Sequence, residues 1–262
     1  PRAYPCQYRS AEGGRVSRRI ICWYSDGAAS AIAAKLTLRD HPDALVVYCG
    51  TNAEHPDNVR FRADCVRWFN APIIVIQSDE YADTWDVWER RKFLSGIKGA
   101  PCTGELKLAP RLAFQRPDDI HVFGYTADSA DVARAARLRE HYGELTIWTP
   151  LIDRGIDKSA CLALLQTAGI EIPAMYRLGF QNNNCIPCVK ATSPNYWALV
   201  RREFPAEFAR MVELSRRLGA RLTRINDERV FIDEIPADWP CTSPIAPACD
   251  FLCHIAEQDF AA

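Results

Sequence analysis

The sequence lacks the features that define several large classes of protein. It has no apolar run near the roughly 20 residues that a membrane-spanning helix needs, and no internal repeat or low-complexity stretch. We also expect no secretory leader. Its 32 basic and 33 acidic residues nearly cancel, so the whole chain has no electrostatic reason to bind nucleic acid. We therefore expect a globular cytoplasmic protein without membrane association, in which nucleic-acid binding would require a local basic face.

Disulfides are not expected either, although the chain contains 11 cysteines. In a reducing compartment, cysteines serve as packing residues, metal ligands or nucleophiles. Four of them lie in apolar strand-like or helix-like segments, where free cysteine usually packs in the core: Cys22, Cys49, Cys65 and Cys161.

Apolar runs rich in Val and Ile alternate with helix-like segments from Arg19 onward. The apolar runs cover residues 19–24, 44–50, 72–78, 119–126 and 145–151. The helix-like segments cover residues 28–38, 58–69, 84–94, 128–140 and 158–169. Buried strands between amphipathic helices predict an α/β fold, in which a parallel sheet is connected by crossover helices.

The composition divides the chain into three parts. We expect a loose lead-in over residues 1–18, a nucleotide-binding α/β domain over residues 19–170, and a C-terminal extension over residues 171–262. The extension begins with a segment rich in Asn, Pro, Gly and Cys, continues as helix after Trp197, forms a short strand at residues 230–235, and ends in a Cys-bearing tail.

The first strand-to-helix loop is a candidate phosphate site. Exposed backbone N–H groups and the positive end of a helix dipole together favour anions, and small residues let a nucleotide approach closely. A plain structural turn has the same composition. The candidate nucleotide-binding residues of this loop are Ser25, Asp26, Gly27, Ala28 and Ser30.

Two later strand ends join this candidate site. Thr51 opens the segment that runs to Asp57 after the second strand, and we expect it to line the nucleotide pocket, although the same residues also suit an ordinary helix start. Gly124 lies near the end of the fourth apolar run and is also a candidate nucleotide-binding residue.

Three cysteines carry the strongest signal. Cys185 and Cys188 have the C-x-x-C spacing that grips one metal centre from a tight turn, and Cys102 can supply a third thiolate from a distant loop. The C-x-x-C pair alone leaves a zinc site, a redox dithiol and two chance neighbours open.

These cysteines and their surroundings resemble a known family. Cys102, Lys107 and Pro110 fall on the C-C-x-x-R-K-V-x-P motif of assimilatory APS reductases, and residues 172–180 lead into the C-x-x-C pair much as in that family. The first loop also matches the S-G-G-x-D-S pattern of ATP pyrophosphatases at Ser25, Gly27 and Ser30. Over residues 20–192 the chain thus resembles the PAPS/APS reductase-like family of the adenine nucleotide α-hydrolase (PP-loop) superfamily.

The resemblance implies a Rossmann-like fold, an adenine nucleotide (ATP, APS or PAPS) at the first loop, and a [4Fe–4S] cluster on the three cysteines. It implies that Lys107 contacts a nucleotide phosphate and takes part in catalysis. It also implies that a tail cysteine, Cys249 or Cys253, attacks the sulfur of a sulfonucleotide, since the family carries an E-C-G-x-H thiol there. A cluster ligand and a purely structural role remain open for both tail cysteines.

The departures from the family concern the ligands. Thr103 stands in place of the second Cys of the C-C pair, so the fourth cluster ligand is Cys241, Cys249 or Cys253, or that position is open. Thr126 stands where the reductases place an Arg that holds the phosphate or sulfate. Ala29 replaces the Asp of the pyrophosphatase loop.

We expect an enzyme, for which two chemistries are candidates, and a non-catalytic role is a third alternative. The first is a sulfonucleotide-reducing oxidoreductase or sulfurtransferase that uses a thioredoxin-like reductant. The second is ATP-dependent thiolation of a nucleic acid or small molecule, with Mg²⁺ if ATP is the substrate. The third is a non-catalytic nucleotide- or redox-sensing module with a structural zinc or iron–sulfur centre. We also expect a homo-oligomer.

Residues around the Cys102 loop complete the expectations. Basic side chains near it, among them Arg90, Lys107 and Arg111, form either a solvated face or a patch for a nucleic-acid backbone. Trp85 and Trp88 recur at helical spacing and are expected in the core.

Overall fold

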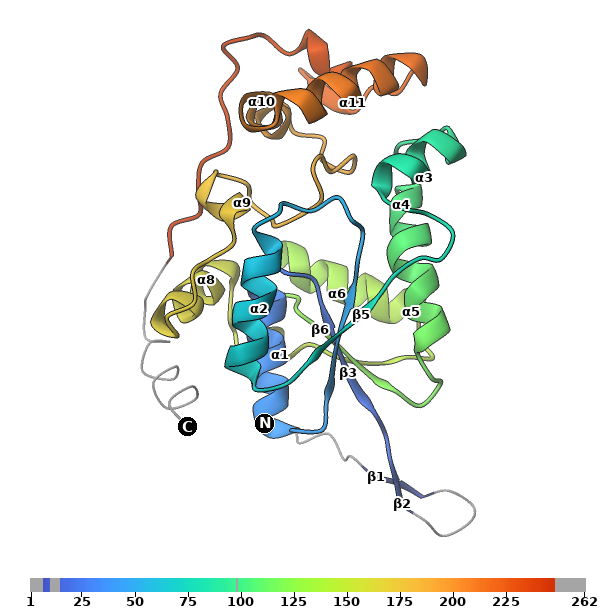
Figure 1. The fold of residues 1–262 in the computed structure, drawn as a ribbon, viewed down its shortest axis with the longest axis vertical. Helices are drawn as coiled ribbons and strands as arrows, with labels where there is room; N and C mark the ends of the chain where they lie inside the picture. Colours follow the sequence, from blue (N-terminus) through green and yellow to red (C-terminus); the bar gives the residue numbers. More distant parts are fainter. Residues whose placement is uncertain (1–6, 10–14, 98, 248–262) are drawn as a thin grey trace.

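A five-stranded parallel sheet forms the centre of the computed structural model, which describes residues 7–9, 15–97 and 99–247 (Figure 1). The strand order is β5–β4–β3–β6–β7, with every neighbouring pair parallel. The strands are β3 (Ile20–Tyr24), β4 (Leu45–Cys49), β5 (Ile73–Ile76), β6 (Ile120–Phe123) and β7 (Thr146–Trp148). The predicted α/β fold with a parallel sheet is confirmed.

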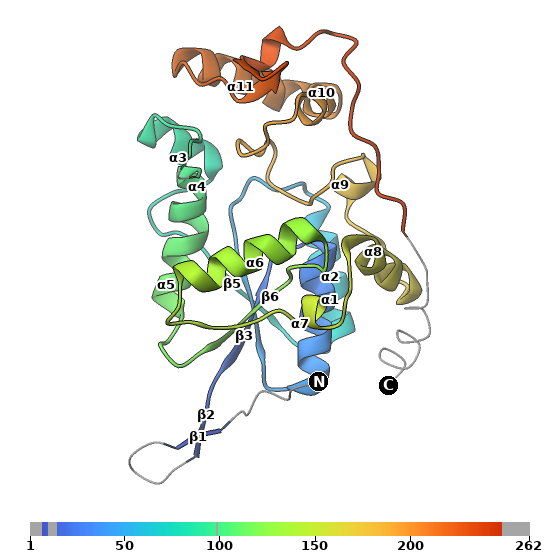
Figure 2. The ribbon, with the colours of Figure 1, turned by 180° about the vertical axis from the view of Figure 1, so that it is seen from behind.

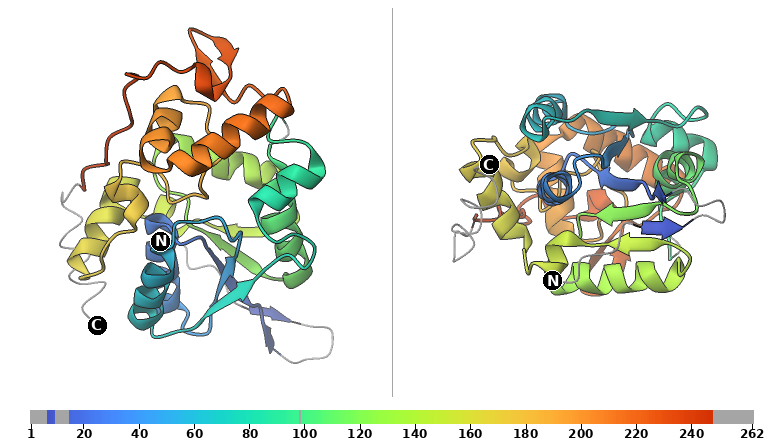
Figure 3. Two further views of the ribbon diagram at one scale, coloured as in Figure 1. Left: turned by 45° about the horizontal axis from the view of Figure 1, so that its top comes forward. Right: turned by 90° about the horizontal axis from the view of Figure 1, so that it is seen from below.

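Crossover helices cover both faces of this sheet (Figures 2 and 3). One face carries α1 (Ala28–Asp40) and α2 (Asn58–Phe69), with α7 (Pro150–Asp153) and α8 (Lys158–Thr167) packed against α1. The other face carries α5 (Ala109–Phe114) and α6 (Ser129–His141), and Figure 2 shows α6 crossing it. The first strand, β3, is central, so the direction of winding reverses between β3 and β6. In open α/β sheets ligands bind at such a switch point, outside the carboxyl ends of the strands.

The main core lies between the sheet and α1, α2 and α8. Ile20, Cys22 and Tyr24 alternate toward it from β3, as expected for a strand with a side-chain period of two. Cys22, Cys65 and Cys161 are buried, as predicted. Cys49 is only half-buried, because it stands at the open carboxyl end of β4 rather than inside the sheet.

A second core joins the C-terminal extension to the middle of the chain. Helices α10 (Pro194–Glu203) and α11 (Pro205–Arg217) lie beyond the carboxyl ends of the strands (Figure 1). Trp197 and Met211 from these helices pack in one cluster with Trp85 and Trp88 of α3 (Thr84–Arg91). The predicted burial of both α3 tryptophans is confirmed. Helix α3, Leu94 and Ala100 therefore share a core with the extension.

Two local predictions are wrong. Residues 230–235 do not form a strand: β8 (Thr223–Ile225) and β9 (Glu228–Val230) pair as a hairpin, and a 3₁₀ turn follows at Ile232–Glu234. The carboxylate of Glu234 accepts the Phe231 amide at 2.9 Å and closes that turn. The lead-in is not uniformly loose, since β1 (Gln7–Arg9) and β2 (Arg15–Ser17) pair antiparallel. No helix within the described ranges is long and apolar enough to cross a membrane.

Candidate functional site

The three predicted cysteine ligands line one pocket near the carboxyl edge of the sheet. Cys102 comes from one side, and Cys185 and Cys188 come from the other, across more than 80 positions of sequence. The pocket contains about 420 Å³ of empty space, including its open mouth. Its remaining wall is formed by Thr51, Thr84, Trp88, Thr103, Lys107, Asn184, Pro187, Val189 and Lys190.

A local irregularity places Cys102 and Lys107 on this wall. Cys102 lies in the single turn α4 (Pro101–Thr103), which begins with Pro101 at a position where proline is tolerated. The chain then forms a π-helical turn at Gly104–Leu108 before α5. Such turns are rare and are frequent at functional sites. Lys107 lies within it, and its exposed side chain lines the pocket.

The C-x-x-C turn is docked on the loop that follows β4. The Ile186 amide donates to the carbonyl of Ala53 at 2.7 Å, and the Cys188 amide donates to the Tyr196 hydroxyl at 2.7 Å. The Thr51 hydroxyl lies in hydrogen-bond contact with Cys185 Sγ at 3.0 Å and also bonds the Glu54 carboxylate. Thr51, predicted at the nucleotide, therefore belongs to the cysteine pocket.

Two buried donors of the pocket wall have no partner in the described part of the chain. They are the indole Nε1 of Trp88 and the hydroxyl of Thr84, both from α3. Buried polar groups are nearly always hydrogen-bonded, so the Thr84 hydroxyl calls for an acceptor inside the pocket. The Trp88 indole already acts on the Cys102 thiol: burial raises the pKa of that thiol, and the indole acts in the opposite direction. Burial raises the pKa of Cys185 to about 11, while the Lys107 cation acts in the opposite direction.

No three Cys, His, Asp or Glu side chains of residues 7–9, 15–97 and 99–247 are grouped to share a single metal ion. The pocket wall combines three thiols, two lysines, the Trp88 indole and the Thr84 hydroxyl, a donor set that fits a sulfur-rich group of negative charge.

The first loop begins α1 without a side-chain cap. Gly27 is the N-cap residue, the Ala28 amide donates to the Tyr176 hydroxyl at 3.3 Å, and Ser30 Oγ donates to the Gly27 carbonyl at 2.9 Å. Ser30 Oγ also accepts the amide of Ser25 at 3.1 Å. Ser25 is exposed, whereas Gly27, Ala28 and Ser30 are buried. The exposed face of the loop is thus made by Ser25 and the half-buried Ala29.

The side chain of Asp26 does not reach this exposed face. It is fully buried and forms an ion pair with Arg62 of α2, with one contact of 3.0 Å. Arg62 in turn lies 3.8 Å from the centre of the Tyr48 ring. A ligand contact by the Asp26 carboxylate, as predicted, does not suit this placement; the residue instead holds the loop against α2.

Asn183 links the first loop to the C-x-x-C segment. Its side-chain amide donates to the Asp26 carbonyl at 2.5 Å and to Asn58 Oδ1 at 2.9 Å. Sequence reasoning did not identify Asn183 or Arg62, although the run of three asparagines before Cys185 is an unusual feature that marks the segment. The two halves of the candidate site are therefore in direct contact.

Gly124 stands where the fourth strand end meets α1. A Cβ atom on it would lie 2.7 Å from Ser30 Cα and 2.8 Å from Ser30 N, so only glycine lets these backbones approach. Thr126, in the place of the expected Arg, is buried and donates to Asp128 at 2.7 Å. Its hydrogen bond lies at the N-terminus of α6, and its side chain does not supply the positive charge of the expected Arg.

The remaining predicted residues lie elsewhere. Cys249 and Cys253 lie outside the described residues. Cys241 is half-buried and packs against the second core.

Comparisons with known proteins add little to this geometry. No family model matches the chain, and no curated protein matches it. Among solved structures, the crystal structure of phosphoadenylyl-sulfate (PAPS) reductase from Candida auris in its phosphate complex is similar, with 10% sequence identity and a TM-score of 0.48. The match covers 64% of this chain and 81% of that chain. At these values the likeness carries no argument about function, which rests on the residues themselves.

Proposed function

We propose that this protein is an enzyme that binds an adenine nucleotide at the first loop and carries out sulfur chemistry in the cysteine pocket. One observation carries the proposal: Cys102, Cys185 and Cys188, from two distant segments, line one pocket together with Lys107. Packing alone gives no reason to bring three thiols and a cation together at the carboxyl edge of a parallel sheet, where ligands bind.

The three thiols would hold a [4Fe–4S] cluster. Such a cluster, when bound, supplies a localised negative sulfur-rich surface and a redox centre whose potential depends on hydrogen bonds to its sulfurs. Thr84 and Trp88 are placed to donate such bonds. No described residue provides a fourth cysteine on the pocket wall, so the fourth ligand is Cys249, Cys253 or a ligand from solution.

The nucleotide would lie across the first loop. The first turn of α1 has no side-chain cap, so the amide of Ala29, on the exposed face of the loop, is available to a phosphate. Lys107, which lines the cysteine pocket, would supply a positive charge for this phosphate. Asn183 of the C-x-x-C segment donates a hydrogen bond to the first loop and so fixes the position of the cysteine pair relative to that loop.

Sulfonucleotide reduction is the version we favour. In it, the thiolate of Cys249 or Cys253 attacks the sulfur of APS or PAPS, the S–O bond to the nucleotide phosphate breaks, and the adenine nucleotide leaves. The enzyme thiosulfonate is then reduced by a thioredoxin-like dithiol, which becomes a disulfide while sulfite is released. ATP-dependent thiolation is the alternative chemistry.

Product analysis distinguishes these chemistries. Anaerobically purified protein with a dithiol reductant is supplied with APS, PAPS or ATP, and sulfite, AMP and pyrophosphate are measured. We expect sulfite from APS or PAPS, its loss in Cys185→Ser, and its retention in Cys241→Ser, a matched control outside the pocket. Formation of pyrophosphate and AMP from ATP would establish the thiolation version instead. If the protein forms neither sulfite from APS or PAPS nor AMP and pyrophosphate from ATP, the proposal that it is an enzyme is contradicted.

A further inference from the structure

The β8–β9 hairpin carries two arginines directly opposite each other. Its register pairs Arg224 with Arg229, and the side chains of directly opposed residues lie on the same face of an antiparallel pair. Thr223, the neighbour of Arg224, is fully buried on the other face, so both arginines face solvent, where they are exposed. Like charges directly opposite each other destabilise a hairpin. Packing therefore gives no reason for this pair.

A third arginine lies beside the pair. Arg229 Nη1 donates to the carbonyl of Arg221 at 3.1 Å. The guanidinium carbon of Arg221 lies 5.3 Å from the centre of the Phe231 ring, and the residue is exposed. No acidic residue that the structure describes forms an ion pair with Arg221, Arg224 or Arg229. The hairpin thus carries three exposed arginines whose charges are not compensated by an ion pair.

The acidic residues near the hairpin are placed elsewhere. Asp233 and Glu234 both pair with Arg216 of α11, at 2.9 and 3.1 Å. Glu228 lies on the opposite face of the hairpin from the arginine pair, because side chains alternate along a strand. Asp227 stands in the turn at the end of the hairpin. The face with the arginines therefore remains positive.

The hairpin is attached to the segment that follows the C-x-x-C pair. The Thr223 hydroxyl donates to the carbonyl of Thr192 at 2.8 Å, and the Arg224 amide donates to the same carbonyl at 3.3 Å. Between Cys188 and Thr192 stands the exposed Lys190, which lines the cysteine pocket. The basic residues of the hairpin thus continue toward the pocket. We refer to these four residues as the basic face: Lys190, Arg221, Arg224 and Arg229.

Charge, rather than apolar surface, characterises the basic face. The exposed large hydrophobic side chains of the described residues all lie between positions 59 and 132, so none belongs to this face. Interfaces between proteins depend on buried aromatic and aliphatic anchors, whereas interfaces with nucleic acids are polar and strongly positive. Residues 190–230 contain nine Lys or Arg and five Asp or Glu, although the whole chain has a net charge of −1. The face therefore suits a phosphate backbone better than a protein partner.

We propose that the basic face binds the phosphate backbone of a nucleic acid and leads it to the mouth of the cysteine pocket. An arginine guanidinium takes two oxygens of one phosphate in a bidentate manner. The Phe231 ring is not free to stack on bases, because Arg216 and Arg221 lie over it, so binding is independent of base sequence. The proposal does not rest on the sulfur chemistry, but a nucleic acid held here would be placed as the acceptor of the thiolation alternative.

Fluorescence anisotropy of a labelled single-stranded RNA of mixed sequence tests the basic face on the full chain. The hairpin variant Arg224→Gln/Arg229→Gln should fold at least as stably as wild type, because it removes a repulsion. Its matched control, Arg67→Gln/Arg134→Gln, removes two exposed charges from α2 and α6. We expect the hairpin variant to bind RNA at least about tenfold more weakly at low salt. Its plot of log K against log salt should be less steep by about 1.4, from about 0.7 for each lost phosphate contact, while the control behaves as wild type.

The outcomes separate the possible partners and the two proposals. Equal RNA affinity in wild type and the hairpin variant, or no saturable binding to wild type, would overturn the basic face. Tighter binding of polyglutamate than of the RNA would indicate an acidic protein partner and would also overturn it. Cys185→Ser should lose sulfite formation and bind RNA as wild type does. If RNA binding depends on the hairpin while wild type forms neither sulfite nor AMP, only the proposed function fails.

Discussion

The hydroxyl of Thr51 lies 3.0 Å from the sulfur of Cys185, although 134 positions separate the two residues in sequence. The contact joins the end of the second strand to the C-x-x-C turn, and the Ile186 amide reinforces it by donating to Ala53. Through these bonds the parallel sheet, rather than the C-terminal extension alone, fixes the position of the cysteine pair.

Replacing Thr51 by Val removes this hydroxyl with little change in shape. We expect the free energy of unfolding to fall by about 1 kcal/mol, since Cys185 and Glu54 each lose a buried hydrogen-bond partner. Denaturant titration measures the change. Thr51→Ser keeps the hydroxyl and should lose less; equal losses in the two variants would show that the hydrogen bond is not the cause.

Asp26→Asn tests the buried ion pair beneath the first loop. Asp26 has a positive φ of 55°, which Asn also adopts, so the substitution mainly leaves Arg62 without its countercharge. Removing one partner of a buried pair costs roughly 3 kcal/mol. The double variant Asp26→Asn/Arg62→Met should be more stable than Asp26→Asn alone. If Arg62→Met lowers the free energy of unfolding as much in the Asp26→Asn variant as it does in wild type, the two residues are not coupled.

Gly124→Ala tests the close approach of β6 to α1. The added Cβ meets backbone atoms that cannot move aside, so we expect a loss of about 1–3 kcal/mol and weaker nucleotide binding. Gly143→Ala is a matched control, because the nearest atom to its Cβ would be 4.0 Å away. If Gly124→Ala has the stability and the AMP affinity of wild type, the close approach of Gly124 to the backbone of Ser30 is contradicted.

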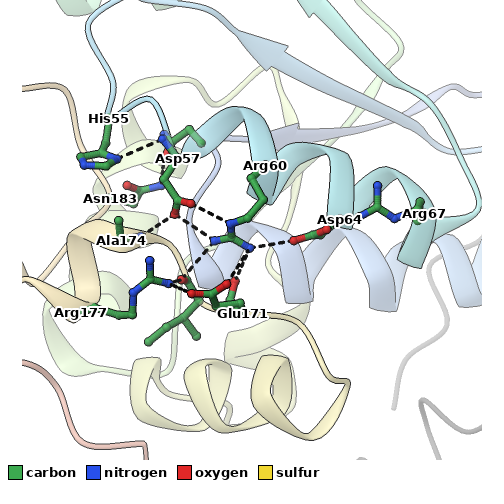
Figure 4. A network of polar contacts seen from close by, with 11 residues as sticks. His55, Asp57, Arg60, Asp64, Arg67, Glu171, Ala174, Arg177 and Asn183 are labelled. Carbon is green, nitrogen blue, oxygen red and sulfur yellow. Dashed lines mark hydrogen bonds and ion pairs between the residues drawn. The ribbon is translucent and has the colours of Figure 1, made fainter.

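Acid stability should depend on Asp57, which anchors α2 to residues 171–177 (Figure 4). Its carboxylate accepts from Arg60 and from the Ala174 amide at 2.8 Å. The hydrogen bond from Arg60, with a smaller contribution from Ala174, lowers the pKa of Asp57 to about 2. Its stabilisation is therefore complete above the unfolded pKa near 4 and disappears as the pH falls toward 2.

The difference between the pKa of Asp57 in the unfolded chain and in the folded chain corresponds to roughly 2 kcal/mol of stability. Asp57→Asn should abolish that part of the pH dependence, while Asn at the exposed Asp43 should leave it in place. Urea unfolding at several pH values between 2 and 6 gives the comparison. An unchanged acid profile in Asp57→Asn would show that the network of Figure 4 does not anchor the helix.

The sequence predicted the features that depend on local pattern. Runs such as IICWY and LVVYC between amphipathic segments indicate buried parallel strands, and the sheet confirms them. Residues 230–235 have an equally strand-like pattern, but there the Glu234 side chain closes a turn through the Phe231 amide. A competing side-chain bond of this kind is invisible in a hydrophobic pattern.

Interactions between residues that are far apart in sequence could not be predicted either. An acidic residue in a phosphate-like loop gives no sign that its charge is neutralised by Arg62, 36 positions away. In the same way, Arg111 reads as one member of a basic surface patch, whereas the folded chain turns its guanidinium toward Phe123 and Tyr142. Only the tertiary structure reveals which charges are paired.

The most direct test of the cysteine pocket is the metal content of anaerobically purified protein. We predict about four irons and four acid-labile sulfides per chain in wild type and in Cys241→Ser, and a loss of both in Cys102→Ser and Cys185→Ser. One zinc per chain, or the same iron content in Cys185→Ser as in wild type, would contradict the account.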